Sequence, residues 1–159
     1  MLPGLAHEGG NTALERAQDL IYEAMEATGA KQSRLAREAL AISPDCADAY
    51  VVLAENAATA DEAIDLYEKG VAAGQRAIGR KRFEEYAGHF WGFLETRPYM
   101  RARHGLARTL WEVGRRDEAI SHLDEMLRLN PNDNQGLRYV LLAWLVELER
   151  DQESAALMA

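Results

Sequence analysis

The stretch between residues 100 and 133 constrains the fold of this chain more than any other. Its first half places apolar residues three and four positions apart, and its second half repeats that spacing after a glycine. The spacing puts the apolar side chains of each half on one face of a helix. Gly114 divides the halves and Pro131 follows the second, and both residue types are typical of helix ends. The stretch therefore predicts two helices joined by a tight turn.

The same stretch resembles the tetratricopeptide repeat, a helix–turn–helix unit of about 34 residues. Counted from Met100, the positions that match the repeat pattern are Leu106, Ala107, Leu110, Gly114, Ala119, Leu123 and Pro131. Two positions depart from it, because Arg103 replaces an aromatic residue and Met126 replaces a small one. The phrase at 89–102, HFWGFLETRPYMRA, is similar to one in a bacterial subgroup of these proteins. The resemblance implies an all-α, right-handed superhelix of antiparallel helix pairs, with about seven or eight helices.

Weaker copies of this pattern flank the central hairpin. We expect residues 1–11 to be a flexible tail and residues 12–159 to form a single domain. Within it we assign a degenerate repeat at 12–45, a repeat at 46–78, the most regular repeat at 97–131 and a partial repeat at 133–159. A repeat array needs a polar cap, whereas the last predicted helix is strongly apolar. The chain is therefore expected to be a fragment of a longer protein or to be covered by a second copy.

The second and third repeats are separated by roughly twenty residues more than the family's period allows. Within this insertion, the apolar residues at helical spacing are Phe83, Tyr86, Ala87, Phe90, Trp91 and Leu94. The pattern predicts an inserted aromatic helix at 80–95 that fills a gap in the superhelix, because such aromatic stripes usually lie in a core. The helix before it is expected to continue to Ile78. Gly70 and Gly74 within that helix either let a neighbouring helix approach closely or bend it.

Charge is distributed unevenly along the chain, whose net charge is −8. Residues 1–70 carry 13 acidic and 5 basic side chains, residues 71–116 carry 4 and 10, and residues 117–159 carry 9 and 3. Acidic flanks would repel phosphates, so we expect no nucleic-acid partner. No apolar run reaches the ~20 residues of a membrane span, so we expect a cytoplasmic protein with no membrane partner. The single cysteine, Cys46, excludes an internal disulfide.

Motifs of catalysis are absent from the sequence, which has no HExxH, CxxC, GxSxG or glycine-rich phosphate loop. Glu85 and His89 are four residues apart and could share a metal ion. Two ligands without a third make a weak site, and an exposed pair on one helix is the better interpretation. We therefore expect no catalytic residue, no cofactor and no metal site, and keep an enzyme only as a third alternative.

The resemblance to the tetratricopeptide repeat also implies a binding surface, because the first helix of each pair in that family lines a concave groove. The residues expected to face the groove and bind a ligand are Arg101, His104, Arg108, Trp111 and Arg138. Arginine offers a planar set of donors that suits carboxylates. Val51 and Glu55 replace residues that the family's best-known carboxylate clamp requires. The resemblance thus implies a non-catalytic scaffold that binds an acidic segment of a protein or peptide in a cationic groove.

Two alternatives to this groove stay open at the level of sequence. In the first, Glu95, Glu112 and other acidic neighbours neutralise the arginines, and the face is simply solvated. In the second, the protein is a structural adaptor that forms a homodimer through its apolar C-terminal helix, with Trp144 hidden in the dimer.

Overall fold

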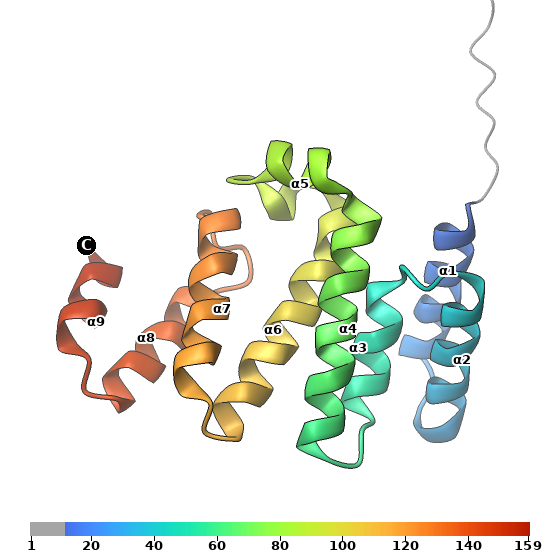
Figure 1. The fold of residues 1–159 in the computed structure, drawn as a ribbon, viewed down its shortest axis with the longest axis horizontal. Helices are drawn as coiled ribbons and strands as arrows, with labels where there is room; N and C mark the ends of the chain where they lie inside the picture. The colour runs from blue at the N-terminus through green and yellow to red at the C-terminus, as the bar shows by residue number, and fades with distance from the viewer. Residues whose placement is uncertain (1–11) are drawn as a thin grey trace, which may run out of the picture.

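The computed structural model describes residues 12–159, and this part of the chain is all-α (Figure 1). The helices are α1 (Ala13–Met25), α2 (Gly29–Ile42), α3 (Ala47–Glu55), α4 (Ala60–Ile78), α5 (Arg80–Tyr86), α6 (Arg97–Glu112), α7 (Arg116–Leu129), α8 (Leu137–Glu147) and α9 (Asp151–Met158). Two short 3-10 helices, η1 (Phe90–Gly92) and η2 (Leu94–Thr96), lie between α5 and α6. The nine α-helices of residues 12–159 exceed the seven or eight predicted, because the last residues form a helix of their own. The tail expected at 1–11 lies outside the described residues.

Four antiparallel pairs make up most of the structure, and Figure 1 shows them side by side along its long axis. The pairs are α1 with α2, α3 with α4, α6 with α7, and α8 with α9. The first helices of successive pairs also contact one another, α1 with α3 and α3 with α6. We call the surface formed by α1, α3, α6 and α8 the first-helix face.

The turn after α6 and the turn after α8 have the same geometry. Gly114 has a φ of 85°, and Glu149 has a φ of 56° at the corresponding place. The next residue in each turn, Arg115 or Arg150, donates its backbone N–H to the carbonyl five residues earlier at 2.9 Å. The same arginine pairs with the glutamate three residues later at 2.7 Å. This shared construction supports the assignment of α8 and α9 as a further helix pair of the same kind.

Helices α4 and α6 approach closely because each carries a glycine at their interface. A Cβ atom on Gly74 would lie 2.7 Å from the Cβ of Tyr99, and one on Gly105 would overlap the ring of Tyr67. Helix α4 continues without interruption to Ile78, as predicted. A Cβ atom on Gly70 would lie 3.1 Å from the Cβ of Ala102 on α6, so Gly70 and Gly74 both serve close approach, the first of the two interpretations that the sequence left open.

The insertion between α4 and α6 is not the single helix that was predicted at 80–95. Helix α5 ends at Tyr86, and Gly88 follows with a φ of 96°, a conformation that a helix excludes. The aromatic residues of the predicted stripe nevertheless lie in the core or pack against it, whereas Leu94, the last residue of the stripe, is 71% exposed. Phe90 is fully buried, and its ring centroid lies 4.9 Å from that of Phe83 and 5.7 Å from that of Tyr99.

Candidate functional site

The predicted site residues lie on two helices of the first-helix face, Arg101, His104, Arg108 and Trp111 on α6 and Arg138 on α8. They do not form one cluster. His104, Arg108 and Trp111 line a cavity of about 250 Å³ between α6 and α8, together with Glu112, Val140 and Trp144. Arg101 instead lines a groove toward α1, and Arg138 lines a pocket at the C-terminal end. We call the cavity between α6 and α8 the α6–α8 cavity.

Arg101 is held by a carboxylate of the protein itself. Its Nε and Nη2 atoms donate to the two carboxylate oxygens of Asp48 at 2.8 and 2.7 Å, and Asp48 is almost fully buried. Gln18 adds a hydrogen bond from its Nε2 to the same carboxylate at 3.0 Å. The cluster ties α1, α3 and α6 together and neutralises the charge of Arg101. The sequence analysis missed this pair, whose two residues lie 53 positions apart.

Arg108 is exposed and, among residues 12–159, forms no ion pair. Arg108 acts electrostatically on Glu55 of α3, whose pKa lies above its ordinary value because burial and Asp48 raise it more than Arg108 lowers it. Glu112 lines the same cavity. The other acid predicted to neutralise the arginines, Glu95, accepts a hydrogen bond from the Tyr86 hydroxyl at 3.1 Å. Arg108 is therefore a guanidinium with acidic neighbours but no fixed partner in the described chain.

His104 contributes an unpartnered polar atom to the α6–α8 cavity. Its Nε2 is buried and has no hydrogen-bond partner within residues 12–159. Burial lowers the pKa of this imidazole, and the nearby charge of Arg108 lowers it further. The ring is therefore neutral near pH 7, and its Nε2 is left without a hydrogen-bond partner in the described chain.

Trp111 has both ring faces covered by the protein. The ring of Trp144 stacks on one face, with centroids 4.5 Å apart and an angle of 2° between the planes, and the guanidinium of Arg116 lies 4.4 Å from the centroid. Only the ring edge is left for contact with a ligand. Trp144 is only 8% exposed, so it is already covered within one copy of the chain. The exposed apolar residues of α8 are instead Tyr139 and Val146.

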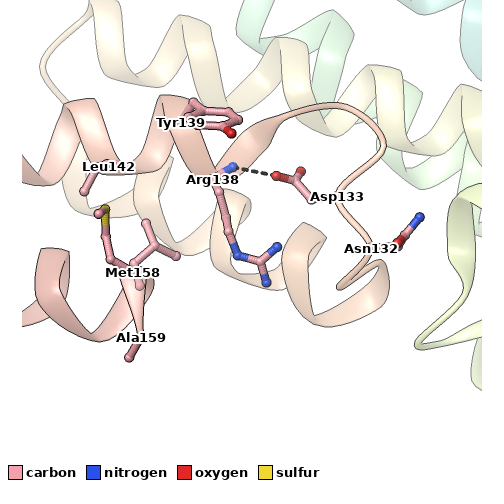
Figure 2. Close-up of a pocket in the computed structure, with 8 residues that line it drawn as sticks. Asn132, Asp133, Arg138, Tyr139, Leu142, Met158 and Ala159 are labelled. Atoms are coloured by element: carbon pink, nitrogen blue, oxygen red, sulfur yellow. Dashed lines mark hydrogen bonds between the residues drawn. The ribbon is translucent and has the colours of Figure 1, made fainter.

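Arg138 lies apart from the α6–α8 cavity, in a pocket of about 470 Å³ that Figure 2 shows. Its Nη1 donates to the carbonyl of Pro131 at 3.0 Å. Its backbone N–H and that of Leu137 donate to the Asp133 carboxylate at 3.0 and 2.7 Å, which fixes the start of α8. Leu142 lies on the apolar side of this pocket.

The described residues show no arrangement suited to metal chemistry. No group of three or more metal-binding side chains occurs within residues 12–159. Glu85 lies in α5, whereas His89 lies beyond its end, so the two do not share a helix as the sequence had suggested. Cys46 is buried, and burial raises the pKa of its thiol to about 11, so the sulfur is unreactive.

Comparison with known proteins defines the class of repeat. A family model described as the tetratricopeptide repeat matches residues 100–145, which span α6, α7 and most of α8. This part of the chain is therefore a tetratricopeptide repeat within an all-α protein. Neither the curated proteins nor the solved structures gave a match.

The repeat carries a general expectation about activity. Tetratricopeptide repeats suggest a protein-interaction scaffold whose partners are proteins, and proteins that contain them are usually non-catalytic. No catalytic family matched. Within residues 12–159, no helix combines the length and the apolar character needed to cross a membrane.

Proposed function

We propose that this protein is a non-catalytic scaffold that binds an acidic segment of a partner protein at the α6–α8 cavity. In this proposal the helix pairs follow a right-handed superhelix, whose concave side is the first-helix face. The observation that carries the proposal is that Arg108 and His104 line the same cavity. Arg108 is an exposed cation without an ion pair, and the buried Nε2 of His104 has no hydrogen-bond partner within residues 12–159.

Recognition of a carboxylate at this place uses two donors, and because Nε2 of His104 is buried, neighbouring side chains must shift to expose it to the ligand. The guanidinium of Arg108 donates to the carboxylate, and His104 in its Nε2–H tautomer donates a second hydrogen bond. The edge of Trp111 and the side chain of Val140 supply apolar contact beside it. Arg101 contributes rigidity rather than charge, because Asp48 already neutralises it.

Reversal of one charge tests the proposal. The measurement is a fluorescence-anisotropy titration of a labelled peptide of Glu and Asp interspersed with Leu. A charge-assisted hydrogen bond contributes about 1.5–3 kcal/mol, so Arg108→Glu should weaken binding by about tenfold or more. Arg37→Glu, on α2 outside the first-helix face, makes the same charge change and should weaken binding much less. Equal affinities of Arg108→Glu and Arg37→Glu for the acidic peptide would contradict the proposal.

A second candidate function is self-association through α8, and a specific observation favours it. Tyr139 is 80% exposed and Val146 is 58% exposed, and the two lie seven residues apart on one side of the helix. Two copies that pair through this side would shelter both residues. Light scattering over a concentration series tests the idea, because Val146→Asp should abolish a dimer. A wild-type protein that stays monomeric at high concentration would rule it out.

A further inference from the structure

A second groove lies on the N-terminal part of the first-helix face, away from the α6–α8 cavity. It has a volume of about 600 Å³ and separates α1 from the segment 94–101. Tyr22 and Met25 line it from α1, and Leu94 lines it from η2. Small residues of α3 and α4, Ala47 and Gly74 among them, also line it. We call this feature the α1 groove.

The walls of the α1 groove gather exposed apolar side chains. Tyr22 is 59% exposed, Met25 is 51% exposed and Leu94 is 71% exposed. Large apolar side chains that lie together at a surface are typical of a site that another molecule covers. Leu94 and Glu95 belong to η2, so the insertion between α4 and α6 supplies part of the lining of this groove.

The cations of the α1 groove are turned toward the protein. Arg97 donates from its Nε to the Trp91 carbonyl at 3.1 Å, and its guanidinium lies 4.9 Å from the Trp91 ring centroid. Arg101 is bound by Asp48. The charge of Arg101 is therefore neutralised, whereas Arg97 keeps its charge and packs its guanidinium against Trp91.

Two acids that line the α1 groove are exposed. Glu15 accepts a hydrogen bond from the Thr12 backbone N–H and Glu95 accepts one from the Tyr86 hydroxyl, and neither forms an ion pair within residues 12–159. A third carboxylate, Asp45, pairs with Arg76 at 2.8 Å. Residues 12–70 also carry 12 acidic and 5 basic side chains, which adds negative charge around the groove.

We propose that the α1 groove is a second docking site, for an amphipathic protein segment with an apolar anchor flanked by lysine or arginine. The apolar anchor packs between Tyr22, Met25 and Leu94, and the basic residues face Glu15 and Glu95. This ligand has the opposite charge to the one proposed for the α6–α8 cavity, so the two sites select different segments. The inference does not rest on the proposed function.

The test uses a labelled synthetic peptide with Leu at every third or fourth position and Lys at most others. Leu94→Asp removes an apolar wall and adds a negative charge, so apolar docking and simple charge attraction predict opposite changes. We expect the Kd to rise by about tenfold or more, because the anchor loses the contact that buries it. Val113→Asp adds the same charge to an exposed apolar position at the other end of α6 and should leave the Kd unchanged.

Several results would overturn the inference. One is an equal or lower Kd for Leu94→Asp, and another is equal affinity for a peptide of the same composition with its apolar residues dispersed. Binding only after removal of residues 1–11, or a dimer that Leu94→Asp dissociates, would assign the groove to this chain itself. Arg108→Glu should leave the affinity for this basic peptide unchanged, so the outcome is independent of the acidic-peptide site.

Discussion

The close approach of α4 and α6 depends on Gly74, and Gly74→Ala should destabilise the protein. A Cβ atom at this position would lie 2.7 Å from the Cβ and 2.9 Å from the Cα of Tyr99. Carbon atoms pack best at about 3.5–4.0 Å, so the helices must separate by about 1 Å. Tyr99 is fully buried and one of the two atoms belongs to its backbone, so rotation of a side chain cannot relieve the overlap.

The magnitude follows from two opposing effects. Overpacking of a core destabilises a protein by about 1–3 kcal/mol, and replacement of glycine by alanine within a helix stabilises it by about 1 kcal/mol. Because the overlap involves the backbone, we place the destabilisation by overpacking near its upper limit. The free energy of unfolding should therefore fall by about 1–2 kcal/mol. For a chain of this length, that loss corresponds to a fall in Tm of about 2–8 °C.

The assay is thermal unfolding followed by far-UV circular dichroism, with urea unfolding as a second measure. Gly92→Ala is the matched control, because a Cβ atom there has no neighbour within 4 Å. It should change Tm by much less than Gly74→Ala. A Gly74→Ala protein as stable as the wild type, or more stable, would refute the packing of α4 against α6 described above.

Three further predictions concern stability. Glu149 adopts a left-handed φ of 56°, which glycine tolerates better than other residues. Glu149→Gly should therefore raise the free energy of unfolding, measured by urea titration, by about 0.5–1 kcal/mol. A lower stability would contradict the turn geometry. Asp48→Asn should lower the free energy of unfolding by about 1–3 kcal/mol, because Arg101 loses its charged partner in the cluster that joins α1, α3 and α6. An unchanged midpoint of urea unfolding would contradict the importance of that cluster. Burial lowers the pKa of His122, and Arg103, which donates from its Nε to the Nδ1 of His122 at 3.0 Å, lowers it further. The unfolded chain, with the ordinary pKa of 6.5, then binds the proton more readily. Stability should therefore be constant above that pH and fall below it, and His122→Gln should reduce the fall; equal pH dependence in both proteins would show that His122 is not responsible.

The central hairpin could be predicted from the sequence because its information is local. Apolar residues at helical spacing gave α6 and α7, and Gly114 marked the turn between them. The insertion could not be predicted in the same way. Its apolar spacing is equally compatible with a helix and with α5 followed by two 3-10 helices, and the positive φ of Gly88 decides between them.

The candidate site depends on contacts between distant parts of the chain, which spacing alone does not reveal. The ion pair between Arg101 and Asp48 joins residues 53 positions apart. The stacking of Trp111 on Trp144 depends on how α8 packs against α6. Arg101 and Trp111, which had been expected to bind a ligand, are therefore engaged by other residues of the protein. Arg108 and His104 are the residues for which we propose that role.

An NMR titration of the labelled protein with the acidic peptide tests the central claim most directly, because each backbone amide reports separately. The account predicts the largest chemical-shift changes in α6 between residues 104 and 112, at the start of α7 beside Trp111 and in the neighbouring part of α8, with small changes in α2 and in the C-terminal half of α7. Changes centred on α2 or on the C-terminal half of α7, or an acidic peptide that leaves the amides of residues 104–112 unchanged at saturation, would contradict it.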